Sequence, residues 1–202
     1  MSEIRGLRLG RAEEEAGARR AADGVLRAAA AGGLVDVGYA EVDSPFGPLL
    51  VATTRRGLVR LAYPNETPDD VLQELADEVS PRVLESRDMT AEVSRELQEY
   101  FEGDRRRFQV SIDWRLVRGF AERVLRATAR IPFGRVTTYK EIAGRAGNDR
   151  ASRAAGNALG SNPIPIVVPC HRVLHTGGGL GGYTGGLERK EFLLTLEGAL
   201  GG

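Results

Sequence analysis

The segment from Asn162 to Val173 restricts the folding of this chain more than any other stretch of its sequence. It reads Asn-Pro-Ile-Pro-Ile-Val-Val-Pro-Cys-His-Arg-Val, so three prolines punctuate a run of apolar residues. Each proline fixes its own φ angle and disfavours helix in the residue before it. The segment is therefore predicted to be extended and rigid, and to present Cys170 on a stiff arm.

Cys170 is the only cysteine among 202 residues, and the chain has two histidines. One cysteine cannot form a disulfide within the chain, and these residues are too few for the usual structural zinc site. We therefore expect neither a disulfide nor a metal. A thiol that stays reduced is typical of the cytosol.

Two further features favour a cytoplasmic protein without a membrane span. Residues Met1–Gly10 contain arginines but no apolar core of a secretory signal follows them. The longest apolar runs fall far short of the roughly 20 residues that cross a bilayer.

The formal net charge of zero conceals an uneven distribution. Residues 115–202 carry 13 Lys/Arg against 6 Asp/Glu, and the rest of the chain carries 15 against 22. A basic C-terminal half can attract a polyanion such as DNA. Arginines on exposed helix faces explain the same numbers, so charge alone leaves both interpretations open.

The chain divides into three parts by its patterns. Residues 1–36 are rich in Ala, Arg and Glu and are predicted to form a helical extension, to which we assign no function. Residues 37–114 are predicted to form an α+β domain, in which an antiparallel meander is followed by two amphipathic helices. The expected strands are 37–42, 49–53 and 58–62, and the expected helices are 69–79 and 90–101.

Residues 115–202 are predicted to form a mostly helical domain. An amphipathic stripe runs from Val117 to Leu125, and Thr138 with Glu141 forms a capping box that opens a short helix. A second short helix is expected over 150–159, and a last one over 190–200. Two short helices joined by a tight turn are the outline of a helix-turn-helix, although most such pairs serve only for packing.

The chemistry of the thiol singles out the region around Cys170. A lone cysteine is more often an inert core residue than a nucleophile. Here His171 is adjacent, and Arg172 and Lys190 follow; basic neighbours lower a thiol pKa, and the thiolate is the nucleophile. This pattern favours a catalytic cysteine.

Several residues together resemble one known family. Pro169-Cys170-His171-Arg172-Val173, the later Tyr183-Thr184-Gly185-Gly186-Leu187, and Tyr139 and Arg153 before them are similar to the methylated-DNA–protein-cysteine methyltransferases, or O6-alkylguanine-DNA alkyltransferases. The resemblance runs from about Gly119 to Gly198, and a weaker one covers the chain from Val37. It implies an α+β fold: an N-terminal antiparallel sheet with helices, ribonuclease H-like, and then a winged helix-turn-helix-like domain.

The resemblance also implies a reaction. Cys170 would accept the alkyl group of O6-alkylguanine in double-stranded DNA by direct displacement. O4-alkylthymine is a second lesion that the resemblance allows. His171 would pass the thiol proton through a water toward Glu197, and Asn162 would brace the turn that holds them. These are the nucleophile, proton acceptor and orienting carboxylate that a thiol needs.

The remaining site residues implied by the resemblance contact DNA or the damaged base. Tyr139 would bond the leaving guanine and a phosphate, and Arg153 would replace the flipped base in the stack. A core or capping role for Tyr139 and a solvated position for Arg153 are the alternatives. The pocket and DNA contacts would be completed by Ser152, Val173, Tyr183, Thr184 and Lys190.

The resemblance implies a monomer that needs no cofactor and acts once, because no second thiol can remove the alkyl group from Cys170. Two other functions are the alternatives. A module that only binds lesions has another residue in place of the cysteine, and a Cys-His hydrolase needs an oxyanion hole that the sequence does not indicate. The glycine-rich stretch 177–186 lacks the Gly-Lys-Ser/Thr ending of a phosphate-binding loop.

Overall fold

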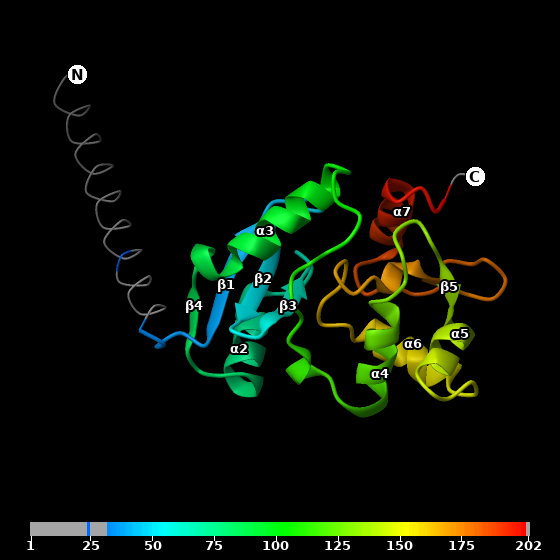
Figure 1. The fold of residues 1–202 in the computed structure, drawn as a ribbon, viewed down its shortest axis with the longest axis horizontal. Helices are drawn as coiled ribbons and strands as arrows, with labels where there is room; N and C mark the ends of the chain where they lie inside the picture. Colours follow the sequence, from blue (N-terminus) through cyan, green and yellow to red (C-terminus); the bar gives the residue numbers. More distant parts are fainter. Residues whose placement is uncertain (1–23, 25–31, 201–202) are drawn as a thin grey trace, which may run out of the picture.

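The computed structural model describes residues 24 and 32–200, and it divides into a sheet-containing part and a helical part (Figure 1). The predicted helical extension over residues 1–36 lies almost wholly outside the described residues. Within them, no helix combines the length and the apolar character that a membrane crossing requires.

The N-terminal part is built on a four-stranded sheet in the order β3-β2-β1-β4. The predicted antiparallel meander is confirmed as β1 (Val37–Val42), β2 (Leu49–Thr54) and β3 (Gly57–Ala62). A fourth strand, β4 (Val83–Glu85), was not predicted; it pairs in parallel with β1. A segment of three residues is too short to show the alternation of apolar and polar residues that marks a strand.

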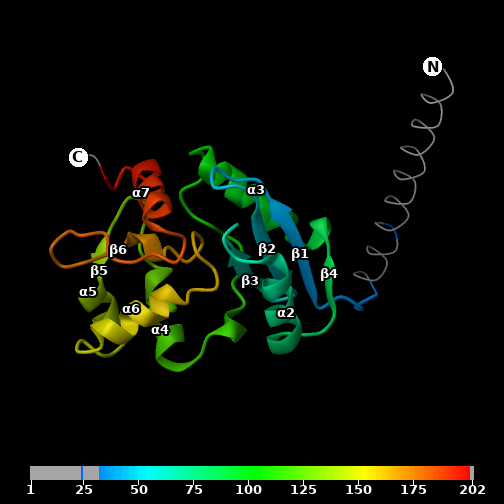
Figure 2. The same ribbon diagram turned by 180° about the vertical axis from the view of Figure 1, so that it is seen from behind.

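Two helices cover opposite faces of this sheet, as the views from both sides show (Figures 1 and 2). Successive strand residues point to opposite faces. Accordingly, Val51 packs in the cluster that contains Leu97 of α3 (Arg87–Phe101), whereas Leu50 and Ala52 pack in the cluster that contains Leu75 of α2 (Pro68–Glu78). Every residue of β2 is buried for this reason.

The helical part begins with α4 (Gly119–Thr128), which packs against both helices of the predicted helix-turn-helix. Those helices are α5 (Tyr139–Arg145) and α6 (Ser152–Gly160). The capping box is present as predicted: the Thr138 hydroxyl accepts from the Glu141 backbone, and the Glu141 carboxylate accepts from the Thr138 backbone. Small strands β5 (Thr137–Thr138) and β6 (Val173–Leu174) pair in parallel beside α5.

The proline-rich segment is not extended, so that prediction was wrong. It folds back in successive turns, in which the Val168 amide donates to the Ile164 carbonyl over 2.9 Å. Ile166 has a φ of 72°, a left-handed conformation that a β-branched residue rarely adopts. The three prolines of the segment lie within this series of turns. Cys170 begins a single 3-10 turn, η2 (Cys170–Arg172), at its end.

The last helix also differs from its predicted bounds. It is α7 (Leu187–Leu196), whereas residues 190–200 were expected. Glu197 is therefore the residue that caps the C-terminal end of the helix rather than a residue within it. This position lets the Glu197 side chain turn back into the core.

The segment between the two parts is anchored to the edge of β3. The Leu58 amide donates to the Ser111 carbonyl, and the Asp113 amide donates to the Leu58 carbonyl, each over 2.8 Å. Gly57 allows this close approach: its φ is 130°, and a Cβ built on it would lie 2.1 Å from the Ser111 carbonyl oxygen. The connection to the short helix η1 (Trp114–Leu116) thus depends on a glycine.

We predict that Gly57→Ala destabilises the protein more than Gly103→Ala. Gly103 also has a positive φ, of 86°, but a Cβ there would meet nothing within 4 Å. Gly103→Ala should cost about 1 kcal/mol through its backbone conformation alone, and Gly57→Ala should cost at least about 2 kcal/mol more through the clash. Urea unfolding of both variants tests this, and equal losses would contradict the assigned clash.

Candidate active site

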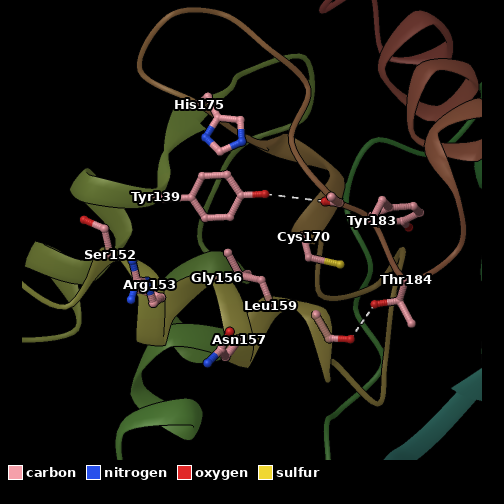
Figure 3. A pocket seen from close by; sticks show the side chains of 12 residues that line it. Tyr139, Ser152, Arg153, Gly156, Asn157, Leu159, Cys170, His175, Tyr183 and Thr184 are labelled. Atoms are coloured by element: carbon pink, nitrogen blue, oxygen red, sulfur yellow. Dashed lines mark hydrogen bonds between the residues drawn. The ribbon is translucent and has the colours of Figure 1, made fainter.

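A pocket of about 620 Å³ opens beside α6 in the helical part. Figure 3 shows Cys170 at its inner end, with Tyr139 on one side and Tyr183 and Thr184 on the other. Six residues expected from the sequence line it together: Tyr139, Ser152, Arg153, Cys170, Tyr183 and Thr184. The others that line it are Gly156, Asn157, Leu159, Gly160, His175 and Gly182.

Cys170 combines a buried position with access to this pocket. Cys170 is 4% exposed, and its Sγ lies 3.2 Å from Nδ2 of Asn162. Burial raises the pKa of the thiol, and the Asn162 hydrogen bond and the charge of Lys190 offset only part of that effect. The expectation that basic neighbours lower the thiol pKa is therefore wrong as a net result, because desolvation is the larger influence.

Asn162 ties the thiol to the coiled proline segment. Its Nδ2 also donates to the Val168 carbonyl over 2.8 Å, and its Oδ1 accepts from the Ile164 amide over 3.0 Å. The side-chain amide thus bonds both ends of the turn that precedes Cys170. Any rotation of Asn162 would break three contacts at once, so the position of Sγ is tightly defined.

His171 and Glu197 lie directly behind Cys170. Nε2 of His171 is 2.9 Å from Oε1 of Glu197, and both side chains are fully buried. Burial lowers the pKa of His171, which keeps the imidazole neutral. Because the carboxylate only accepts, the single proton of this ring lies on Nε2.

That tautomer leaves Nδ1 of His171 as a free acceptor. Nδ1 is buried and has no hydrogen-bond partner among the described residues. A buried ring nitrogen without a partner is uncommon and is a natural place for a proton to be received. His171 follows Cys170 directly in the chain, and both belong to the same 3-10 turn.

Glu197 is held by groups from three other segments. Arg172 binds it through two hydrogen bonds of 2.8 Å, from Nε to Oε2 and from Nη2 to Oε1. The Tyr100 hydroxyl of α3 donates to Oε1 over 2.7 Å, and the Gly134 amide donates to Oε2 over 3.3 Å. The hydrogen bonds from His171 and Arg172 outweigh burial and lower the pKa of Glu197 to about 2.

Arg172 points away from the thiol, contrary to the expectation that its charge would activate Cys170. Its guanidinium faces Glu197, and Nη1 donates to the Ile131 carbonyl over 2.5 Å. In a 3-10 turn, residues two positions apart point in different directions. Arg172 therefore acts on the carboxylate, and Cys170 points into the pocket.

Tyr139 and Arg153 come from the two helices of the helix-turn-helix. The Tyr139 hydroxyl donates to the Gly182 carbonyl over 3.4 Å, and its ring lies 5.1 Å from that of His175 (Figure 3). Ser152 and Arg153 form the first residues of α6, and Arg153 is exposed at the pocket edge. The two positions place one aromatic and one cationic side chain at the entrance.

The opposite wall is fixed by a contact with the sheet. The hydroxyls of Tyr183 and Tyr63 lie 2.7 Å apart, and Tyr63 follows β3. Arg189 lies over the Tyr63 ring at 4.9 Å and donates to the Gly185 carbonyl over 2.6 Å. Thr184 donates to the Gly160 carbonyl over 2.6 Å. The N-terminal part thus positions a wall of the pocket.

Val173 and Lys190 do not line the pocket. Both are fully buried, and Nζ of Lys190 donates to the carbonyls of Val173 and Leu180. Burial lowers the pKa of Lys190 to about 8. Lys190 thereby fixes the two ends of the loop that carries Gly177–Gly179 and contributes positive charge near the thiol.

Sequence reasoning missed several residues of this site. Arg172 was noted only as a basic neighbour, and no sequence signal links Tyr100 or Tyr63 to it because both lie in the other part of the chain. His175 had no motif around it. Gly156 was recognised as a small residue, and the four-residue spacing to Gly160 could have shown that both lie on one helix face. No cluster that could hold a metal ion occurs among the described residues.

We predict that Glu197→Gln is destabilising at pH 7 and less so in acid. The folded pKa of about 2 lies below the ordinary 4.5, so ionised Glu197 stabilises the fold above pH 4.5 and this contribution is lost as the pH falls toward 2. At pH 7 the variant leaves the Arg172 charge unpaired, which should cost about 3–5 kcal/mol.

Urea unfolding at pH 7, 4.5 and 3 measures this difference. Glu191→Gln, at an exposed position of α7, is the matched control and should change the free energy of unfolding by less than about 0.5 kcal/mol at each pH. A Glu197→Gln difference that stays constant from pH 7 to pH 3 would contradict the assignment.

Two family models match the chain, one over each of the two parts just described. Residues 37–114 match the ribonuclease-like domain of 6-O-methylguanine DNA methyltransferase, and residues 119–199 match its DNA-binding domain.

Characterised relatives and solved structures agree with these models. The methylated-DNA–protein-cysteine methyltransferase of Methanosarcina acetivorans is 42% identical over 161 residues, which is 80% of this chain and 98% of the relative. That of Mycolicibacterium paratuberculosis is 40% identical over 79% of this chain and 91% of its own length. A Mycobacterium tuberculosis OGT structure, solved in complex with DNA, is 36% identical with a TM-score of 0.68 and covers 80% of this chain and 93% of that one. The chain belongs to the methylated-DNA–protein-cysteine methyltransferase family.

Proposed function

We propose that Cys170 is the alkyl acceptor through which this family member repairs DNA. The chain is a methyltransferase that removes alkyl groups from O6-alkylguanine in DNA, and its only thiol lines a pocket large enough to admit a base. This placement, backed by His171 and Glu197, is the observation that carries the assignment. The thiol sulfur would form a bond to the alkyl carbon as the bond from that carbon to O6 breaks.

The proton of the thiol follows the buried chain of side chains. A water between Sγ and Nδ1 of His171 would accept it and give the free ring nitrogen its missing partner. Glu197, ionised through Arg172 and Tyr100, would stabilise the imidazolium that forms. The leaving guanine would take up a proton from water while the Tyr139 hydroxyl donates a hydrogen bond to its ring, and the imidazolium of His171 would return its proton to the solvent.

Helix α6 fits the role of the element that enters a DNA groove. The residues around Arg153 are small, so the helix backbone can approach the duplex closely. A guanine inside the duplex is out of reach of a buried thiol, so the damaged nucleotide must turn outward into the pocket. Arg153, exposed at the pocket edge, would fill the space that the base leaves, and Ser152 would bond a nearby phosphate.

The flipped base would lie between Tyr139 and the Tyr183–Thr184 wall. Peptide groups near Cys170 and Tyr183 would bond its edges, and Lys190, behind the pocket, would hold the segment from Val173 to Leu180 in place. O4-alkylthymine is smaller than the guanine lesion and is a second substrate that this pocket would admit.

Other features of the assignment follow from the chemistry. We propose a monomer that needs no cofactor, because the complete relay from Cys170 to Glu197 comes from one chain. We place it in the cytoplasm, where the thiol stays reduced and DNA is accessible. Residues 37–114 would form the domain that supports the site, and residues 115–202 the domain that binds DNA and accepts the alkyl group.

We predict that incubation with a duplex containing O6-methylguanine increases the intact mass by a single methyl group. Cys170→Ala should show no increase, although it should still bind the duplex because its pocket is otherwise unchanged. Intact-mass spectrometry measures the transfer, and fluorescence anisotropy measures the binding. Binding by the natural chain with no gain in mass would identify a lesion-binding module instead and would sink the proposal.

We predict that Arg153→Ala slows repair of duplex DNA by about 10- to 100-fold, because the energy of unstacking the base is no longer offset. Transfer from the free base O6-benzylguanine should change by less than about twofold. Arg150→Ala removes a neighbouring exposed arginine that does not line the pocket, and it should weaken duplex binding without slowing transfer at saturating DNA. Equal losses on duplex and free base would argue against the wedge role.

A further inference from the structure

A second cleft, of about 570 Å³, lies between the two parts of the molecule. Its walls are the segment after α3, which includes Arg106 and Arg107, and the loop after α4, which includes Arg130. Phe108 and Phe133 form apolar surface between them, and Arg172 lines its inner part. It shares no lining residue with the pocket at Cys170.

The charge of this cleft is strongly one-sided. Among the lining residues that the structure describes, four are arginines and none is an aspartate or glutamate. Arg106, Arg107 and Arg130 are exposed and take part in no ion pair within residues 32–200, whereas the adjacent Arg105 pairs with Glu96 and Glu99. Like charges that converge on a concave surface repel one another unless an anion lies between them.

Arg172 supplies a buried, hydrogen-bonded guanidinium to the lining of the cleft. Its side chain is 7% exposed. A guanidinium has five N–H donors, and those of Arg172 make three hydrogen bonds, to Glu197 and to the Ile131 carbonyl. Two donors therefore remain on a rigidly held group that lines the cavity. The stacking of Arg172 and Arg106 on Phe133, at 5.9 and 5.8 Å, further limits the motion of both cations.

We propose that this cleft binds a phosphate group. Guanidinium forks match phosphate oxygens geometrically, and several arginines around one concave site are typical of phosphate recognition. The phosphate can belong to the DNA backbone, away from the lesion, or to a small phosphorylated molecule. The site is independent of the alkyl-transfer assignment, because it uses none of the residues proposed to contact the damaged base.

Its position gives the cleft a connection to the reaction. Cys170 and Arg172 lie on the same 3-10 turn, one facing the pocket and the other facing the cleft. A phosphate in the cleft would thus bind the same guanidinium that holds Glu197. A phosphate bound in the cleft would therefore change the environment of Glu197, the last group of the proposed proton relay.

Thermal unfolding in inorganic phosphate and in chloride at equal ionic strength and pH tests the site. At a phosphate concentration ten times its Kd, we expect the Tm in phosphate to exceed that in chloride by about 3–6 °C. The double variant Arg106→Gln/Arg130→Gln should lose this difference. The matched control Arg56→Gln/Arg87→Gln removes two exposed charges elsewhere and should retain it.

DNA binding by the same variants distinguishes the two sources of phosphate. If the DNA backbone occupies the cleft, the double variant should bind a 30-base-pair duplex more weakly than the control, and its salt dependence should fall by about 1–2 in log–log slope. Unchanged DNA binding together with a lost Tm difference identifies a small phosphorylated molecule.

Two results would overturn the proposal. One is an equal Tm in phosphate and chloride for the natural chain, and the other is a phosphate-specific rise that Arg106→Gln/Arg130→Gln retains. Transfer from free O6-benzylguanine in the absence of phosphate should be the same in the double variant and the natural chain. A negative result for phosphate binding in the cleft can therefore be distinguished from a negative result for alkyl transfer to Cys170.

Discussion

The buried carboxylate of Glu197 is the interaction on which the rest of the structure depends. It joins α3, the loop after α4, the turn that carries Cys170, and the end of α7 through Tyr100, Gly134, His171 and Arg172. An ionised group in the interior is unfavourable unless it is paired and fully hydrogen-bonded. The sheet and the helices must dock correctly to satisfy it. The same requirement orients His171, so assembly of the fold and assembly of the proton relay are one event.

This arrangement explains how a single thiol can be both protected and reactive. Burial raises the pKa of Cys170, so the resting side chain is a thiol with little tendency to react with other electrophiles. In the proposed reaction, the neutral imidazole of His171 would accept the proton only when an alkyl group is in place for attack. Because the product is a stable thioether and the chain has no other cysteine, selectivity before the reaction matters more than recovery after it.

Local patterns identified much of this molecule. Alternating apolar residues predicted the three long strands, and Thr138 with Glu141 predicted the start of α5, because both signals arise from neighbours in the chain. The motif around Cys170 predicted the residues proposed to carry the chemistry. The partner Tyr100 of Glu197 could not be inferred, since docking of the two parts brings it there, and the partner Arg172 was missed because its direction depends on the 3-10 turn after Cys170. The path of the proline segment was missed because Ile166 adopts a backbone conformation that local propensity disfavours.

The glycines of α6 have a consequence for the entry of the base. Gly156 and Gly160 lie one helical turn apart and both line the pocket, so the helix presents backbone at these two positions, beside the side chains of Asn157 and Leu159. At these two positions no side chain has to be ordered when a base enters. The entropy lost on binding therefore falls mainly on the nucleic acid rather than on the protein. Such a receptor favours nucleotides that are already weakly stacked or mispaired.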